Sequence, residues 1–102
     1  MVFYKDRYTA IEYESSQKSK RRYKKIFLDY ELDRHLDKVL YITSTPELSQ
    51  KLLKEAAYYH KLFFVGLEDL QKDGMNARVR NAEEGCSLRE FFEIPHKPKP
   101  VF

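Results

Sequence analysis

The fold of this chain is decided by residues 38–66, which read KVLYITSTPELSQKLLKEAAYYHKLFFVG. Residues 38–43 are rich in β-branched and aromatic side chains and residues 62–65 form a continuous apolar run, so both segments predict strands. The segment between them predicts a helix over 46–60, because Thr45 can cap it and Pro46 suits its first position. A strand, a helix and a second strand in this order predict two parallel strands in an α/β domain.

The segment before this unit predicts a β-hairpin followed by a long helix. Residues 2–4 and 8–14 are strand-like, and alternation along 8–14 puts Glu12 and Glu14 on one face. The helix is expected over 16–34, capped by Ser15 or Ser16. Its apolar stripe has the spacing i, i+3, i+4, i+7, carried by Tyr23, Ile26, Phe27 and Tyr30.

Taken together, these elements predict an α/β fold with a small mixed sheet, an N-terminal hairpin, a long basic helix and a βαβ unit. The chain has 102 residues, which is enough for one domain, predicted here over 1–94. Three prolines in residues 95–102 predict an extended tail. Residues 76–84 are ambiguous, but Arg78 and Arg80 alternate with apolar neighbours as in an exposed strand.

Several classes of protein are disfavoured by composition. A single cysteine, Cys86, excludes an intramolecular disulfide framework and favours a reducing, cytoplasmic location. No apolar run approaches the ~18 residues of a membrane span, so no membrane partner is expected. The spacing of cysteine and histidine does not suit zinc, and the hydroxyls of Ser44, Thr45 and Ser87 are better explained as helix caps than as nucleophiles. His60 is expected at a helix end in a structural role.

Positive charge is concentrated in residues 18–25. Six of these eight residues are cationic, whereas the whole chain has a net charge of only +3, so the remainder is acidic. A cluster of this kind can follow a phosphate backbone without reading sequence, which predicts contact with DNA. The alternative is a solubilising helix face. The candidate nucleic-acid-binding residues are Lys18, Lys20, Arg21, Arg22, Lys24 and Lys25.

Two carboxylates lie directly before this basic cluster. Glu12 and Glu14 would stand about 7 Å apart on one face of a strand, where they could share Mg²⁺ with water and a phosphate oxygen. Lys18 could orient a hydrolytic water if residues 15–18 form a loop. The candidate catalytic residues are therefore Glu12, Glu14 and Lys18, with the two glutamates as metal ligands. The alternative is that both glutamates belong to the solvated face of an antiparallel strand.

Residues 10–23, which read AIEYESSQKSKRRY, resemble a motif of the nuclease-like part of bacterial replication-relaxation proteins. In that family a strand with two acids leads into a Lys- and Arg-rich helix that ends in Tyr. Residues 39–44 and 62–66 are similar to the βαβ segment of the same family. The resemblance covers about residues 2–72. It implies a fold similar to PD-(D/E)xK nucleases, Mg²⁺-dependent DNA endonuclease chemistry, and a role in replication or mobilisation of a plasmid or phage.

Two departures from the nuclease motif bear on activity. Glu14 stands where the motif has Lys, so Lys18 would be a displaced lysine. If the hairpin turns around Asp6, the position of the first acid falls before Met1. The chain would then be either a fragment of a longer protein or a stand-alone remnant without a complete metal site. The resemblance therefore implies a DNA-associated, nuclease-like protein with an incomplete site in this chain. The alternatives are a non-enzymatic protein-interaction module, such as a homodimer, and a nuclease completed by a second subunit.

Overall fold

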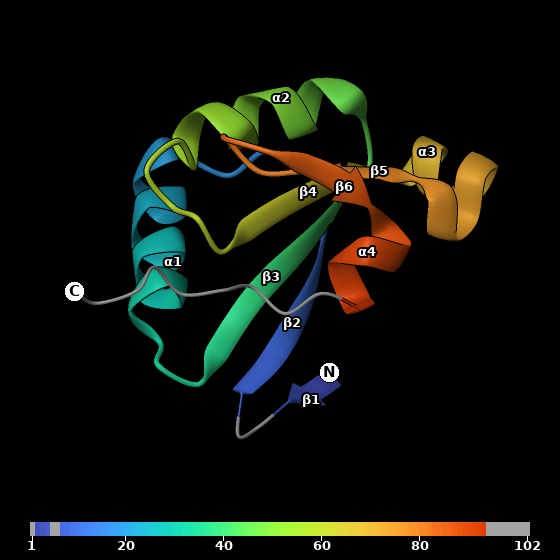
Figure 1. Ribbon diagram of the computed structural model, residues 1–102. Coiled ribbons are helices and arrows are strands. Elements are labelled where there is room, and N and C mark those ends of the chain that lie inside the picture. Colours follow the sequence, from blue (N-terminus) through green and yellow to red (C-terminus); the bar gives the residue numbers. More distant parts are fainter. Residues whose placement is uncertain (1, 5–6, 94–102) are drawn as a thin grey trace.

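A computed structural model describes residues 2–4 and 7–93 as one mixed sheet flanked by helices (Figure 1). The strands are β1 (Val2–Tyr4), β2 (Arg7–Glu14), β3 (Leu36–Thr43), β4 (Leu62–Gly66), β5 (Arg78–Arg80) and β6 (Gly85–Ser87). The helices are α1 (Lys20–Leu32), α2 (Pro46–Glu55), α3 (Leu67–Asp73), the 3₁₀ helix η1 (Gly74–Asn76) and α4 (Leu88–Glu93). The predicted α/β class is confirmed, and the predicted tail over 95–102 lies outside the described residues.

The six strands of the sheet are arranged in sequence order, from β1 to β6. The three central strands β2, β3 and β4 are parallel, as expected for helices that connect strands in the same sheet. The outer strands β1, β5 and β6 join by antiparallel pairing. Val2 pairs with Thr9 and Tyr4 with Arg7, so the predicted hairpin is also confirmed.

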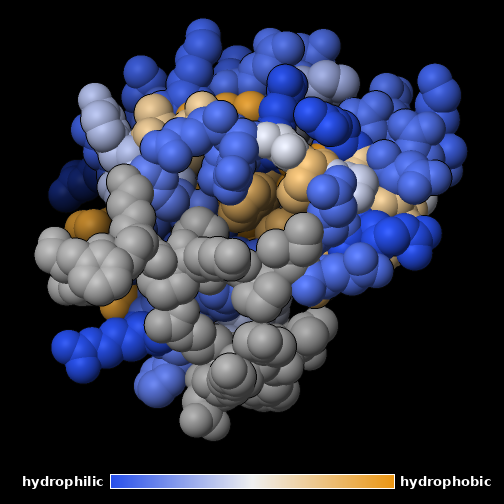
Figure 2. All heavy atoms as spheres, in the orientation of Figure 1, coloured by the Kyte–Doolittle hydropathy of each residue, from blue (hydrophilic) through white to orange (hydrophobic). Residues whose placement is uncertain are grey.

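Two apolar cores lie on opposite faces of the sheet. Helices α1 and α2 cover one face (Figure 1), where Phe27 and Leu52 pack on Tyr41 and Phe64. The other face is covered mainly by α4, whose Phe91 packs with strand residues of β3, β4 and β5. Figure 2 shows hydrophilic side chains over most of one side of the molecule, with apolar ones toward its middle. The helices on both faces make a three-layer domain.

Helix α1 begins later than its sequence suggests. The predicted cap at Ser15 or Ser16 is wrong, because Ser19 is the residue that caps the helix, accepting a hydrogen bond from the Arg22 N–H at 3.3 Å. Residues 15–19 instead form a loop. Ser44 Oγ donates to the Ser15 carbonyl at 2.8 Å and so fixes the start of this loop. The helix ends at Leu32 rather than near residue 34.

Helix α2 is capped as predicted and ends early. The Leu48 N–H donates to Thr45 Oγ1 at 3.2 Å, and Pro46 opens the helix. The helix ends at Glu55 rather than at residue 60, because the following residues turn toward β4. His60 is therefore not at the end of α2. Its Nδ1 lies 3.1 Å from a carboxylate oxygen of Glu83.

The C-terminal part of the domain adds a second hairpin and a short helix. Strand β5 confirms the alternation seen in the sequence, with Val79 buried between two exposed arginines. Cys86 lies within β6. Ser87 and Glu90 form the predicted capping box, with bonds of 3.2 Å and 3.1 Å between each backbone N–H and the other side chain. Within the described ranges, no helix is long and apolar enough to cross a membrane.

Candidate functional site at the start of helix α1

Glu12 and Glu14 both lie on the face of the sheet that α1 and α2 cover. Their neighbours in β3 are Tyr41 and Thr43, respectively, and only 7% of the Glu14 surface is exposed. Glu12 is half-buried. The alternative that both glutamates form a solvated antiparallel face is therefore wrong. It fails because β2 pairs in parallel with β3 and is covered by α1, so this face of the strand points inward.

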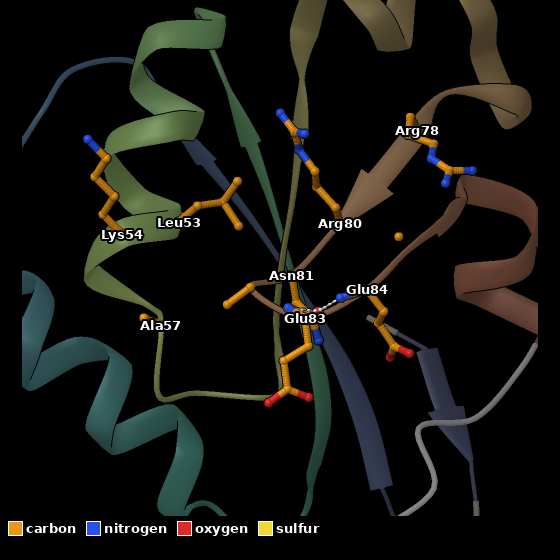
Figure 3. A pocket seen from close by; sticks show the side chains of 10 residues that line it. Leu53, Lys54, Ala57, Arg78, Arg80, Asn81, Glu83 and Glu84 are labelled. Carbon is orange, nitrogen blue, oxygen red and sulfur yellow. Dashed lines mark hydrogen bonds between the residues drawn. The ribbon is translucent and has the colours of Figure 1, made fainter.

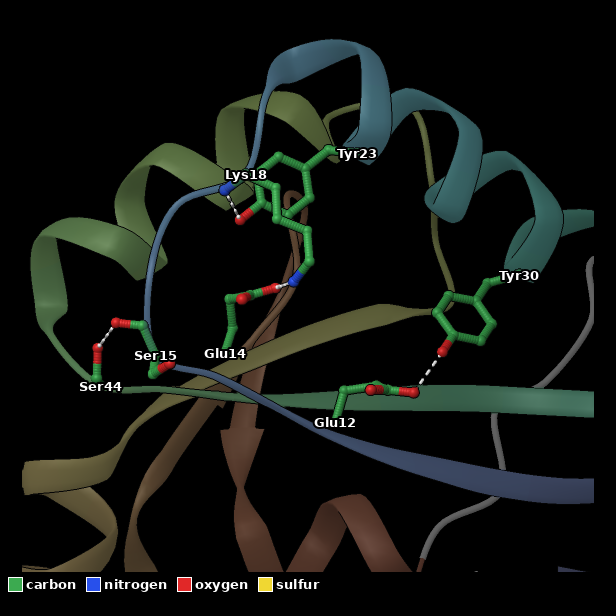
Figure 4. Close-up of polar contacts among 7 residues, drawn as sticks. All are labelled: Glu12, Glu14, Ser15, Lys18, Tyr23, Tyr30 and Ser44. Atoms are coloured by element: carbon green, nitrogen blue, oxygen red, sulfur yellow. Dashed lines mark hydrogen bonds and ion pairs between the residues drawn. The ribbon is translucent and has the colours of Figure 1, made fainter.

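Lys18 returns over the end of β2 and pairs with Glu14 (Figure 4). The Lys18 ammonium is bonded to Glu14 Oε2, and its backbone N–H donates to Tyr23 Oη at 2.8 Å. The pair forms across the loop of residues 15–19, which turns back over the end of β2. Lys18 was expected to reach the site if residues 15–18 form a loop. The structure has that loop, and Lys18 contacts Glu14.

Tyr30 makes the corresponding contact with Glu12. Its phenol donates to Glu12 Oε1 at 2.5 Å from the inner face of α1. Burial raises the pKa of Tyr30 above its ordinary value of 10.0, and the bond to the Glu12 carboxylate raises it further. Burial also raises the pKa of Tyr41, with smaller effects from nearby groups that include both glutamates. Both phenols therefore remain protonated at neutral pH, and Tyr30 stays a donor to Glu12.

The two carboxylates turn toward different partners, Glu12 toward Tyr30 and Glu14 toward Lys18 (Figure 4). Mg²⁺ commonly takes one or two protein carboxylates and completes its shell with water and phosphate, so the donor type and number suit it. In the part of the chain that the structure describes, no group of three or more His, Cys, Asp or Glu side chains could hold a metal ion. A cation bound here would take Glu14 away from Lys18 or share it.

Five of the six predicted nucleic-acid-binding residues face solvent. These are Lys20, Arg21, Arg22, Lys24 and Lys25. Lys18 differs, because it is half-buried and turned toward Glu14. Lys20 Nζ lies 3.9 Å from Glu55 Oε1 at the end of α2. Among residues 7–93, no carboxylate lies within ion-pair distance of the other four cations, so their charge is directed outward.

The charges of α1 run opposite to those that stabilise a helix. Acids are favoured near a helix N-terminus and cations near its C-terminus, because each end carries about half an elementary charge. The first turn of α1 contains no acid and its last turn contains no cation. Its cations are instead gathered in the first half, while Asp29 and Glu31 lie in the second half. Helix stability therefore does not explain the cluster.

Two tyrosines of α1 have roles that the sequence did not show. The helical spacing placed Tyr23 and Tyr30 on the buried face, and Tyr23 is indeed 1% exposed. The Tyr30 hydroxyl bond depends on which strand lies beneath α1 and at what register, and the Tyr23 hydroxyl bond depends on the path of the loop before the helix. The spacing of seven residues, which places both rings on one side of the helix above β2, is the one signal that could have pointed to the two contacts.

Comparisons with known proteins give no family for this chain. No family model, no curated protein and no solved structure matches it.

Proposed function

We propose that this chain is a DNA-associated, nuclease-like protein that contacts the phosphate backbone through α1 and lacks a complete catalytic site of its own. The observation that carries the proposal is the reversed charge order of α1. Cations at a helix N-terminus cost stability, each about 0.3–1 kcal/mol where exposed. Local rules of this kind are broken most often at functional sites. The N–H groups of the first turn of a helix also favour a bound phosphate, although Ser19 already accepts the hydrogen bond of the Arg22 N–H.

The position of the two carboxylates supports the nuclease-like part of the proposal. Glu14 ends β2 and Lys20 opens α1 a short loop beyond the end of that strand, so acids and exposed cations lie at the same end of the sheet. The cations face outward from α1 and the carboxylates lie beneath it, so a phosphate that met both would bind at the start of the helix, beyond the end of β2. Mg²⁺ on these carboxylates would supply Lewis-acid chemistry, and Lys18 would neutralise charge beside Glu14. With the sequence resemblance, this favours a role in replication or mobilisation of a plasmid or phage.

Salt-dependent binding of labelled duplex DNA tests the proposal. Fluorescence anisotropy should show affinity falling steeply with salt, because released counterions give a slope of about −0.9 per phosphate contact. Reversing Arg21, Arg22 and Lys25 to Glu should abolish binding. A matched control reverses Arg34, Lys72 and Arg89, which are exposed elsewhere, and should change affinity much less at the same net charge. Absence of binding by the wild type at low salt would reject the proposal.

A second candidate function, as a protein-interaction module, is favoured by the other face of β2. Ile11 and Tyr13 are 47% and 56% exposed and lie beside Leu40 and Ile42 of β3. Leu40 belongs to the core under α4, so the apolar face continues beyond that helix. A second copy of the chain would cover it as a homodimer. Light scattering should then show a dimer that Ile11→Lys with Tyr13→Lys dissociates, whereas a monomer at all concentrations would reject this candidate.

A further inference from the structure

A hollow of about 580 Å³ lies between α2 and the hairpin of β5 and β6 (Figure 3). Lys54 of α2 lines one wall, and Arg78 and Arg80 of β5 line another. A smaller hollow of about 60 Å³ adjoins the start of α2 and is lined by the same two arginines. The two arginines are therefore common to both hollows.

Arg78 and Arg80 lie on the exposed face of β5, with the Arg78 guanidinium over Gly85 of β6. Val79 between them is fully buried on the α4 face, so the arginines project from the opposite face, on which α2 packs. Both are exposed, and within the described ranges neither lies at ion-pair distance from a carboxylate, although Asp69 also lines the smaller hollow. Two guanidinium groups exposed on one face of a strand can donate charge-assisted hydrogen bonds to an external anion.

The acids of the larger hollow lie on a different rim. Figure 3 shows the side chains of Lys54 and Arg80 directed away from those of Glu83 and Glu84. Glu83 is paired with His60, and its backbone N–H donates to Asn81 Oδ1 at 2.9 Å. The Glu84 N–H donates to the same oxygen at 2.7 Å. These bonds hold the acidic turn in place and leave the opposite rim cationic.

The cations of this rim continue those of α1. Lys20 Nζ approaches Glu55, the residue that follows Lys54 along α2. Lys24 lies one turn after Lys20 and shares its flank of α1. Lys20 therefore lies near the end of α2 that carries Lys54, and Arg80 and Arg78 lie across the hollow from Lys54.

We propose that Arg78 and Arg80, together with Lys54, form a second phosphate-binding site for the nucleic-acid strand that α1 contacts. The inference rests on the proposed function and extends the proposed DNA-contact surface from α1 to the far side of α2. Arginine suits this role because its planar fork donates paired hydrogen bonds to phosphate oxygens. The two guanidinium groups point apart in Figure 3, so they suit successive phosphates of one strand better than a single free ion.

The test compares wild-type protein with Arg78→Gln/Arg80→Gln in titrations of a labelled DNA duplex over a range of salt. The variant should bind more weakly, and the slope of log K against log salt should become shallower by about 0.9 for each phosphate that the variant no longer neutralises. Arg34→Gln/Arg89→Gln removes the same charge from exposed sites elsewhere and should leave the slope unchanged. An Arg78/Arg80 variant that binds like the wild type or like this control would overturn the inference.

Amide and guanidinium resonances identify the source of the phosphate. The Nε–Hε signals of Arg78 and Arg80 should shift on addition of DNA and much less on addition of inorganic phosphate or pyrophosphate. Equal shifts with pyrophosphate, and unchanged DNA affinity in the variant, would mean a site for small phosphates and would refute the inference as stated. Absence of DNA binding by the wild type would reject the proposed function and the inference together, whereas binding that is lost only in the α1 reversal variant would reject the inference alone.

Discussion

Glu14 and Lys18 form an ion pair across a loop, although their spacing of four residues is one that usually marks a helix. The pair exists because β2 ends at Glu14 and α1 does not begin until Lys20. The intervening residues turn back over the strand end. The charge that the sequence assigns to one basic cluster is thereby divided between a buried contact with Glu14 and an outward surface on α1.

Removal of the Lys18 charge should destabilise the fold. Lys18→Met leaves the Glu14 carboxylate without its cation. The carboxylate is largely buried, since 9% of the Glu14 side chain is exposed, compared with 31% of the Lys18 side chain. Breaking a fully buried pair costs about 3–5 kcal/mol, and the partial exposure of Lys18 reduces the expected loss to about 2 kcal/mol. Urea unfolding measures it. Lys18→Arg should retain most of the stability, and Lys18→Met/Glu14→Gln should recover part of it. Equal stability of Lys18→Met and wild type would contradict the role of the pair.

The bond from Tyr30 to Glu12 should be measurable as a coupling free energy. Tyr30→Phe removes only the hydroxyl, and a hydrogen bond to a charged group is worth about 1.5–3 kcal/mol. A double-mutant cycle with Glu12→Gln in urea should therefore give a coupling above about 1 kcal/mol. Tyr58→Phe is the matched control, because Tyr58 is 87% exposed and its change should be nearly neutral. A coupling near zero would show that the contact contributes nothing to stability.

Stability should fall at alkaline pH because of Tyr30 and Tyr41. Burial is the main cause that raises the pKa of both phenols above 10.0. The unfolded chain loses these protons near pH 10 and the folded chain keeps them, so the stabilisation is present below pH 10 and is lost as pH rises further. Lys38 has the opposite effect on stability, because burial lowers its pKa below the ordinary value of 10.5. At pH values just below 10.5 the folded chain has lost this proton while the unfolded chain keeps it, so stability rises with pH there.

Comparison with a variant separates the two alkaline effects. Urea unfolding across the range from about pH 8 to 11 should show a shallower loss above pH 10 for Tyr30→Phe than for wild type, because Lys38 is common to both. Parallel curves for the two proteins would mean that Tyr30 does not titrate differently in the folded and unfolded chains.

Divalent cations should bind at the two glutamates without conferring nuclease activity on this chain alone. Mn²⁺ should broaden the amide resonances of Glu12 and Glu14, and Glu12→Gln should abolish the effect. Glu47→Gln, at an exposed acid of α2, serves as the control. Nicking of supercoiled plasmid with Mg²⁺ or Mn²⁺ that disappears in Glu12→Ala would instead show that the chain is an active nuclease.

The strands and helices could be predicted where local signals agree. The parallel strands β3 and β4 follow from two apolar segments around a well-capped helix, and Thr45 and Pro46 mark the start of α2. The start of α1 could not be predicted in this way. Ser15, Ser16 and Ser19 can all cap a helix, and the choice is made by the contacts of Lys18 with Glu14 and Tyr23.

The site was predictable in its residues and not in its environment. Alternation along 8–14 places Glu12 and Glu14 on one face in either strand arrangement. Whether that face is solvated depends on long-range pairing with β3 and on the cover provided by α1. Lys38 shows the same limit, because its burial against Phe91, with the ammonium 4.3 Å from the ring centre, depends on α4 far along the chain.

Tyr23 connects the carboxylate of Glu14 to the cationic helix α1 through Lys18. Its ring is buried in α1, its hydroxyl holds the Lys18 backbone, and the Lys18 ammonium holds Glu14. A ligand that binds Glu14 would break its contact with Lys18. Movement of Lys18 would then alter its hydrogen bond to Tyr23 in the first turns of α1. Ligand binding at the carboxylates beneath α1 and phosphate binding by the cations on its outer face are thus expected to affect each other.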